Sequence, residues 1–290
     1  MTCATLVAME GRFGFVVAAF CLAACSILVD AGGLSGGPSA STDRGTNGSS
    51  GDSGVGTTDG ATDTDDDASG VHPYVQTVFA DGPSLYYRLE ETSDDELVKD
   101  ETGKHPATFR PGGVHGAAGV FPGSSALRLS GTGGIDADDI LDFEDSAPFT
   151  LEAWFLPEVY DQQYRFLFHH NEGEGPRQNY GLYMHSNDGL GFERYIDNAG
   201  RAVNVQVPSA GTWHHIVAVY DAQRLQLFID AALVGSSADS RSAKDKRAPL
   251  RIAYGWSDGK GVLRGTVDEL AIYEKALSQE RIQAHFDAAR

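Results

Sequence analysis

The clearest pattern in the chain is an alternation of apolar and polar residues that recurs in short runs between residues 84 and 273. Alternation with a period of two places successive side chains on opposite faces of a β-strand. Residues typical of turns, such as Gly, Asp, Asn and Ser, separate the runs. The pattern predicts an all-β fold, an antiparallel β-sandwich, with strands at 84–89, 126–129, 149–156, 164–170, 180–185, 214–220, 224–229, 250–254 and 266–273.

Helical periodicity occurs once, near the end of the chain. Ser278 can cap a helix by accepting a hydrogen bond from a backbone N–H of the first turn. The capping box is incomplete, because Arg281 stands where Glu or Gln would be needed. Ile282 and Phe286 are four residues apart and would share one helical face. We therefore expect a short C-terminal helix that packs on the sandwich through this face.

Residues 1–24 have the character of a secretory signal peptide. Residues 13–24 are wholly apolar or small, and the segment Leu22-Ala23-Ala24-Cys25 resembles the bacterial lipobox. This resemblance implies cleavage before Cys25 and acylation of its thiol. The alternative is an uncleaved transmembrane helix, since apolar residues continue to Val29. Both place the rest of the chain outside the cytoplasm, whether translation starts at Met1 or at Met9. We expect a lipoprotein of the bacterial cell envelope, anchored in the outer membrane and facing the periplasm or the cell surface.

Residues 25–72 comprise the lipidated Cys25 and a linker predicted to be disordered. Gly, Ser, Thr, Ala and Asp dominate residues 26–72, which contain no Tyr, Trp or Phe and carry a net charge of −7. Such a segment cannot bury enough apolar surface to fold, and its charge should extend it. Residues 73–290 remain as one domain. Cys3 and Cys21 lie in the leader, so the mature chain has no partner for a disulfide.

The charge of the predicted domain narrows its partners. Of the net charge of −19, about −12 falls on residues 73–290. Nucleic acids and anionic membrane surfaces attract basic proteins, so we expect no nucleic-acid partner and no membrane contact beyond the lipid anchor. Neutral glycans are compatible with this charge.

Four segments occur in the order found in one family: residues 81–90 with Asp100 and Gly103, residues 149–154, residues 211–221 with 227–230, and residues 265–273 with 276–278. They resemble the laminin G-like domains of exported bacterial proteins, which have the concanavalin A-like lectin/glucanase jelly-roll fold. There are two departures. Tyr87 stands where the family commonly has Trp, and Ala231 follows Asp230 where Gly is usual. Because Ala does not readily adopt a positive φ, we expect the hairpin at Ala231 to be wider than usual or differently shaped.

Jelly rolls of this kind include glycoside hydrolases, which need two carboxylates a short distance apart. Asp268 and Glu269 are adjacent on one predicted strand and are expected to point to opposite faces. Glu152 belongs to a segment that resembles a structural motif of the family. We therefore expect no enzymatic activity. The adjacent His214 and His215 are likewise expected to serve packing or hydrogen bonding rather than a metal site.

Aromatic side chains with polar neighbours are the usual means of gripping a sugar. The candidates on neighbouring predicted strands and one loop are Tyr164, Tyr183, His185, Arg194, Tyr195, Trp256 and Asp258. Trp256 stands out because it lies among turn residues, although it could instead fold over the sheet as a lid on the core. A possible calcium site comprises Asp136, Asp138 and Asp139, whose alternative role is a solvated acidic loop.

The function that these patterns favour is a non-catalytic binding module on a cell-envelope lipoprotein. Its ligand would be a carbohydrate or an exported or surface protein. One alternative is a structural or adhesive envelope protein that binds only proteins, and a further one is a glycoside hydrolase.

Overall fold

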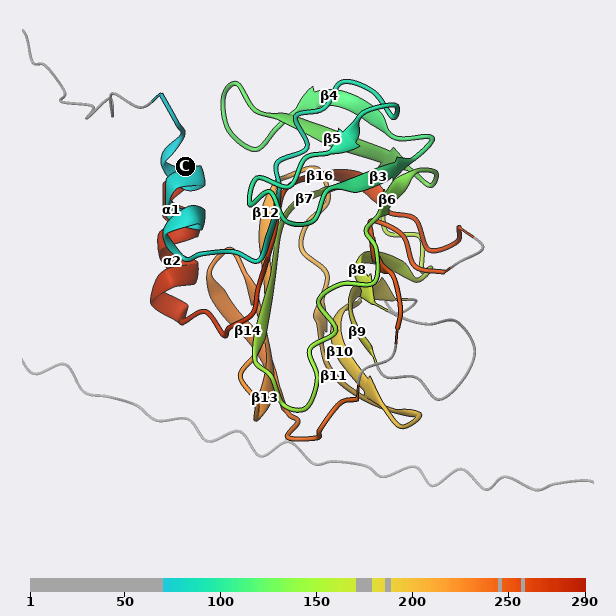
Figure 1. Ribbon diagram of the computed structural model, residues 1–290, viewed down its shortest axis with the longest axis vertical. Helices are drawn as coiled ribbons and strands as arrows, with labels where there is room; N and C mark the ends of the chain where they lie inside the picture. The colour runs from blue at the N-terminus through green and yellow to red at the C-terminus, as the bar shows by residue number, and fades with distance from the viewer. Residues whose placement is uncertain (1–69, 171–178, 186–188, 245–246, 257–258) are drawn as a thin grey trace, which may run out of the picture. The chain divides into compact units, whose positions relative to one another are not determined.

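The structure, a computed structural model, describes residues 70–170, 179–185, 189–244, 247–256 and 259–290. Two antiparallel sheets pack face to face, and two short helices lie beside one of them (Figure 1). The predicted β-sandwich with a short C-terminal helix is confirmed. The predicted leader, Cys25 and nearly all of the linker lie outside the described residues, so those predictions stay predictions. Within the described part of the chain, no helix has the length and apolarity needed to cross a membrane.

The first sheet, sheet A, is built around the longest strands. Every pairing in it is antiparallel, and β7, β12 and β16 form its centre. In spatial order its strands are β14 (Ala232–Ala238), β13 (Arg224–Ile229), β12 (His214–Tyr220), β7 (Phe149–Pro157), β16 (Arg264–Tyr273), β5 (Ser125–Ser130) and β4 (Val114–Ala118), with β1 (Leu85–Tyr87) also paired to β16.

The second sheet, sheet B, faces sheet A across the core and is also antiparallel throughout. Strands far apart in sequence meet in it, as where β8 pairs with β15. In spatial order its strands are β11 (Ala199–Gln206), β10 (Gly189–Ile196), β9 (Asn179–His185), β8 (Arg165–His170), β15 (Leu250–Ile252), β6 (Gly134–Asp136), β3 (Ala107–Arg110) and β2 (Leu97–Val98).

The alternation of side chains explains how the strands of sheet A bury both faces. On β12, Ile216, Ala218 and Tyr220 point into the core between the sheets. Val217 and Val219 point the other way, into a second apolar cluster under the helices. Both sets are almost fully buried, as the sequence predicts for an inner strand.

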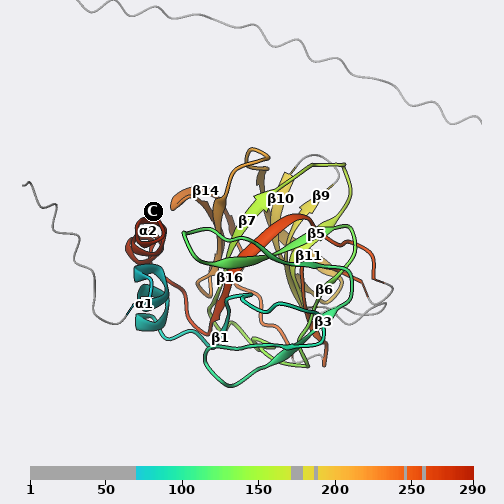
Figure 2. The same ribbon diagram turned by 90° about the horizontal axis from the view of Figure 1, so that it is seen from above.

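Helices α1 (Pro73–Ala80) and α2 (Gln279–Ala288) lie side by side on the outer face of sheet A (Figure 2). The prediction for α2 is confirmed: the Ser278 side chain accepts from Arg281 N, Ile282 is buried, and Phe286 stacks on Trp154 with ring centroids 5.9 Å apart. Helix α1 is absent from the sequence prediction, which has a single helix.

A buried carboxylate links the two helices to sheet A. Glu152 on β7 accepts hydrogen bonds from Tyr74 Oη at 2.9 Å and Tyr273 Oη at 2.9 Å. His215 Nε2 lies 2.7 Å and His285 Nδ1 2.9 Å from the same carboxylate. These contacts join both helices to three central strands, and this network of residues 74, 152, 215, 273 and 285 is here called the Glu152 network.

The hairpin between β13 and β14 differs from the prediction. Asp230 and Ala231 form a two-residue turn with φ of +51° and +64°, and Ile229 pairs with Ala232 directly beyond it. The expectation of a wider or differently shaped loop is therefore wrong, because both residues adopt the positive φ of a tight two-residue hairpin turn. The Asp230 carboxylate fixes the turn, because it accepts from His215 N and lies 2.8 Å from His214 Nδ1. The Ala231 methyl lies in the cluster under the helices, and its burial offsets part of the strain.

Candidate functional site

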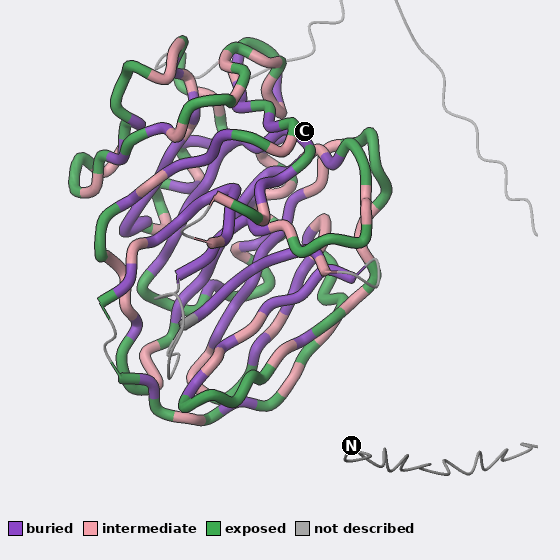
Figure 3. The backbone as a smooth tube through the Cα atoms, turned by 90° about the vertical axis from the view of Figure 1, so that its right-hand side faces the viewer, coloured by how far each residue is buried: buried purple, intermediate pink, exposed green. Residues whose placement is uncertain are grey.

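The two sheets differ in what lies on their outer faces. Helices α1 and α2 cover that of sheet A, whereas no helix among the described residues covers that of sheet B. Figure 3 views the molecule from the side of sheet B, where buried and half-buried stretches of strand lie next to one another. A surface that a fold leaves uncovered while placing large side chains on it is a candidate for binding.

Five aromatic side chains gather on this outer face, and we call them the aromatic face: Tyr164, Phe166, Tyr183, His185 and Trp256. Their ring centroids are separated by 5.0 to 6.4 Å, as in Phe166–Trp256 at 5.0 Å and Tyr164–Tyr183 at 5.7 Å. Most pairs are tilted or edge-to-face, the arrangements that aromatic quadrupoles favour. Tyr164 is 47% exposed and is the outermost of them.

Glycines on neighbouring strands make room for these rings. Gly191 pairs with Tyr183, and Gly189 pairs with His185, across β9 and β10. A Cβ at position 191 would lie 3.2 Å from the Tyr183 ring, and one at position 189 would collide with the His185 ring. The absence of side chains here lets the two rings lie over the backbone of the next strand.

A second pair of glycines serves the loop that carries Trp256. A Cβ at Gly255 would collide with Phe166, and one at Gly261 would lie 2.9 Å from both Phe166 and Trp256. The indole therefore stands edge-on against Phe166 and remains half-buried. Trp256 is not a lid on the core between the sheets, because it lies on the outer surface of sheet B.

Hydrogen-bonding groups border the rings. The Tyr183 hydroxyl donates to Glu193 on β10, and burial raises the pKa of that tyrosine, so it stays a neutral donor and acceptor. Asn204 on β11 is exposed next to Gly191. Tyr195 extends the same side of β10 over Gly200. The face thus combines apolar rings with a carboxylate, an amide and a hydroxyl.

The structure brings together four of the candidates named from the sequence: Tyr164, Tyr183, His185 and Trp256. Tyr195 lies on the same side, further along β10. Asp258 lies outside the described residues. The sequence reasoning missed Phe166 and the supporting glycines, although the alternate glycines 189 and 191 between apolar residues were a usable signal.

Arg194 does not lie on this face, so its prediction as a ligand-binding residue is wrong. It is 2% exposed and points into the interior, where its guanidinium lies 3.8 Å from the Tyr220 ring centroid. Nη1 lies 3.3 Å from Asp239 Oδ2, and Nη2 donates to the carbonyl of Asp145. Adjacent strand residues face opposite sides, so Arg194 and Tyr195 could not share a surface.

The carboxylates considered for catalysis are also placed differently from the expectation. Strand β16 has a bulge between Asp268 and Ala271. Val267 and Leu270 both point into the core between the sheets, while Asp268 and Glu269 both point away from it. The expectation of opposite faces is therefore wrong, because a bulge breaks the alternation.

Both carboxylates are fully buried, however. Asp268 accepts from Val120 N at 2.9 Å, and Glu269 accepts from Tyr86 Oη and Arg88 Nε. Burial raises the pKa of Glu269 to about 7 and raises that of Asp268 well above its ordinary value. With no exposed surface, these groups hold the N-terminal strand and neighbouring loop against β16.

The three carboxylates considered for calcium do not converge in the described part of the chain. Asp136 accepts from Tyr254 Oη, and burial raises its pKa. Asp138 is exposed, and its backbone carbonyl accepts from Leu250 N. Only Asp139 joins a cluster of possible metal ligands, and its partners there are Asp142 and His170.

Comparison with known proteins gives a match by family and by fold. The family model described as concanavalin A-like lectin/glucanases superfamily matches residues 129–283, more than half of the chain. No curated protein matches the sequence.

Among solved structures, domain 4 of an extracellular arabinanase from Geobacillus stearothermophilus, in complex with arabinotriose, matches with a TM-score of 0.56 and 19% identity, over 72% of this chain and 98% of that one. The binding domain of Paraclostridial mosquitocidal protein 1 gives 0.55 and 14%, over 70% and 51%. The binding domain of botulinum neurotoxin DC in complex with SialylT gives 0.55 and 11%, over 72% and 52%. The chain spans about half the length of these two toxin domains. At such identities the likeness is one of fold.

Proposed function

Because the chain belongs to the concanavalin A-like lectin/glucanase superfamily, we propose that its β-sandwich is a non-catalytic module that binds carbohydrate on the aromatic face of sheet B. The observation that carries this proposal is the cluster of Tyr164, Tyr183, His185 and Trp256 on the uncovered side of the sandwich. Two of the similar folds, the arabinanase domain and the botulinum neurotoxin domain, were solved in complex with arabinotriose and with SialylT, which supports a sugar as the class of ligand.

The chemistry of the face suits a sugar ring. The apolar C–H side of a pyranose or furanose packs on an aromatic ring, and its hydroxyls bond to nearby polar groups. Tyr164 and Trp256 offer exposed or half-exposed rings, while Glu193 on β10 and Asn204 on β11 offer hydrogen-bonding groups on the same sheet. The Tyr183 and His185 rings are held by packing on cross-strand glycines, so these two rings lose little freedom of motion on binding.

The shape of the surface and the net charge of the domain favour an uncharged polysaccharide as the ligand. The depression beside His185, which is also lined by residues 159–163, 165 and 184, has a volume of only about 10 Å³. A ligand at this edge would therefore lie on the surface rather than in a pocket, as a segment of a longer polysaccharide can. The net charge of the domain disfavours polyanions.

A module without catalysis is supported by the burial of the strongest acidic candidates. Glu152, Asp268 and Glu269 are all fully buried, so a substrate cannot reach them. Glycoside cleavage needs two accessible carboxyl groups on either side of the scissile bond. Incubation with polysaccharides should therefore release no reducing ends.

The proposal includes a location. With Cys25 acylated and residues 26–72 extended, the sandwich would stand away from a bacterial envelope membrane and meet polysaccharide there. Labelling of cells with a radioactive or clickable fatty acid tests the anchor. Incorporation should occur in the wild type and be lost in Cys25→Ser.

Binding is tested by a glycan array followed by affinity electrophoresis in neutral polysaccharides. We expect retention of the wild-type protein, and at least a tenfold loss of affinity in Tyr164→Ala and in Trp256→Ala, since one stacked ring contributes about 1.4 kcal/mol. Phe79→Ala is the matched control, because Phe79 on α1 is 43% exposed, close to the 47% of Tyr164, but lies beside sheet A. Equal losses in the control, or no retention by any neutral glycan, would contradict the proposal.

A further inference from the structure

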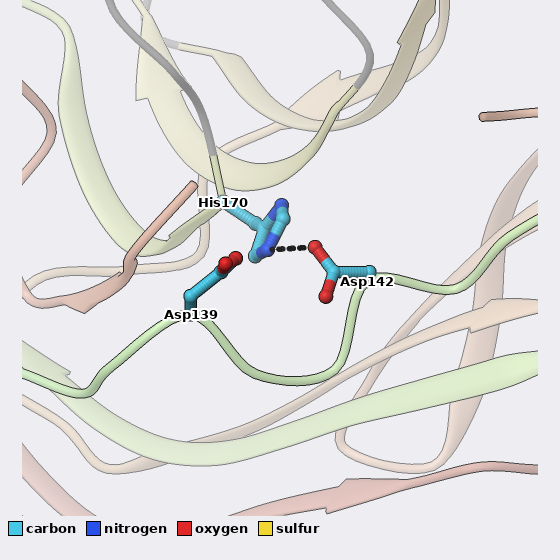
Figure 4. A group of neighbouring side chains, drawn as sticks. All are labelled: Asp139, Asp142 and His170. Carbon is cyan, nitrogen blue, oxygen red and sulfur yellow. Dashed lines mark ion pairs between the residues drawn. The ribbon is translucent and has the colours of Figure 1, made fainter. Parts of the chain in front are cut away.

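Two carboxylates and one histidine meet at the end of strand β8, an inner strand of sheet B. Asp139 and Asp142 lie in the loop between β6 and β7, and His170 is the last residue of β8. Their ligand atoms all lie within 4.8 Å of one another. Figure 4 shows both carboxylates pointing toward the imidazole ring.

The histidine is buried without a hydrogen bond. His170 is 2% exposed, and neither of its ring nitrogens has a hydrogen-bond partner among the described residues. The same is true of Asp142 Oδ1, which is buried and lies 3.2 Å from His170 Nε2 in a geometry that is an ion-pair contact rather than a hydrogen bond. Buried polar atoms without partners are rare, because each costs about 1–3 kcal/mol.

The separation of these two atoms fits a shared metal ion. Ligands bound to one tetrahedral Zn²⁺ at about 2.0–2.2 Å lie about 3.3 Å apart. Such an ion would satisfy His170 and Asp142 together. Asp139 would complete a set of three, because its Oδ1 accepts from Ala248 N at 2.8 Å and its other oxygen is left available.

The donor atoms also select the kind of metal. Calcium takes six to eight oxygen ligands, whereas an imidazole nitrogen with carboxylates suits Zn²⁺ and similar transition metals. Asp139 is exposed and Asp142 is partly exposed, so an ion can enter from the solvent and water can fill the remaining position. This site therefore differs in metal from the calcium site expected at Asp136, Asp138 and Asp139, and it shares only Asp139 with it.

The loop that carries the carboxylates is held in place by other contacts. Tyr180 Oη donates to the carbonyl of Leu141, which has φ of +60°, and Phe143 stacks on Phe149 with centroids 4.3 Å apart. The His170 ring stacks on Tyr180 at 5.0 Å, nearly parallel. The three ligands are therefore oriented before any ion arrives, which strengthens a metal site.

From these observations we propose that Asp139, Asp142 and His170 form a binding site for one Zn²⁺ ion, or a transition-metal ion of similar preference, that ties the β6–β7 loop to the end of β8. Binding would stabilise the folded domain, since the unfolded chain does not bring these residues together.

The test is a calorimetric titration of the purified, chelator-treated and dialysed protein with ZnCl₂. We expect one ion per chain and an unfolding temperature that rises with Zn²⁺. Asp142→Asn should weaken Zn²⁺ binding by at least about 100-fold, because it removes a ligand and second-shell losses alone reach this size. About a hundredfold excess of CaCl₂ should leave the bound Zn²⁺ in place.

Matched controls separate this site from general zinc binding by histidines. Asp138→Asn changes an exposed carboxylate one residue from Asp139, and His214→Gln changes a histidine elsewhere; both should bind Zn²⁺ like the wild type. His170→Gln should abolish Zn²⁺ binding. Because His170 is buried, this variant could fail to fold, and Asp142→Asn then still tests the site. Absence of saturable Zn²⁺ binding, or binding that Asp142→Asn leaves unchanged while His214→Gln removes it, would overturn the proposal.

Discussion

The two outer faces of the sandwich show how one core can serve two purposes. On sheet A, helices α1 and α2 cover the strands, and the charged groups beneath them lie in the Glu152 network. On sheet B, aromatic rings remain at the surface over cross-strand glycines. The Glu152 carboxylate on the first face is satisfied by other groups of the protein, whereas the polar groups on the second face can still bond to a ligand. Residues on the covered face should therefore govern stability, and those on the open face binding.

The largest expected effect is on the covered face, at Glu152. Glu152→Ala leaves His215, His285, Tyr74 and Tyr273 without their shared acceptor, so we expect a loss of about 3–5 kcal/mol in the free energy of unfolding. Urea denaturation followed by circular dichroism measures it. Glu158→Ala, directly after the same strand, breaks only a partly exposed pair with Arg128 and should cost less than about 1 kcal/mol. Similar losses of unfolding free energy in the two variants would show that the Glu152 network contributes no more than a surface ion pair.

A pair of tryptophans compares the faces directly. Trp154 is almost fully buried between β7 and α2, while Trp256 is half-buried on the open face. Trp154→Ala should lower the free energy of unfolding by about 3–5 kcal/mol, and Trp256→Ala by about 1 kcal/mol. Carbohydrate affinity, measured on the folded fraction of each variant, should instead fall more in Trp256→Ala than in Trp154→Ala. A greater loss of affinity in Trp154→Ala would show that the ligand binds elsewhere.

The covered face should also make stability depend on pH. Burial alone would raise the pKa of Glu152, but His285 and His215 hold it well below 4.5, so its contribution is present above pH 4.5 and is lost toward lower pH. Burial alone would lower the pKa of His285, but Glu152 and Asp81 raise it above 6.5. The contribution of His285 to the free energy of unfolding is present below pH 6.5 and is lost as the pH rises through its raised pKa.

The titration of Glu269 lowers stability with rising pH, as that of His285 does. Because burial raises its pKa from 4.5 to about 7, the folded state holds a proton that the unfolded state has released, and stability falls between those pH values. Urea midpoints measured from pH 3 to 9 should therefore peak in mildly acidic solution. Glu269→Gln should flatten the decline between pH 5 and 7. A maximum above pH 8 would contradict these assignments.

Much of the fold follows from the sequence, because alternation reports burial directly. Strands such as β7 and β12 bury both faces, and their residues show it. Helix α1 was missed since eight residues starting at Pro73 carry a weak helical pattern, and its Tyr74 is fixed by a contact with Glu152, 78 positions away. The bulge at Asp268 was missed for a similar reason, as an extra residue is visible only against the partner strand.

The sequence predicts which types of residue form the candidate site, but not which of those residues lie together on one surface. Tyr164, Tyr183, His185 and Trp256 were found because exposed aromatics with polar neighbours suit sugars. Arg194 was misplaced although its adjacency to Tyr195 already assigns it to the other face. The cluster with His170 depends on a loop and a strand that meet only in three dimensions.

The smallest expected effect concerns two strained turns of sheet A that differ in what covers them. Ala222 and Ala231 both have positive φ, +74° and +64°, but only the Ala231 methyl is buried under the helices. Ala222→Gly should raise the free energy of unfolding by about 0.5–1 kcal/mol, because glycine adopts this φ without strain. Ala231→Gly should change it by less than about 0.5 kcal/mol, because the relief of strain is offset by about 0.8 kcal/mol of lost burial. Urea denaturation of the two variants in parallel decides this, and an equal gain in both would show that the covered face contributes nothing at Ala231.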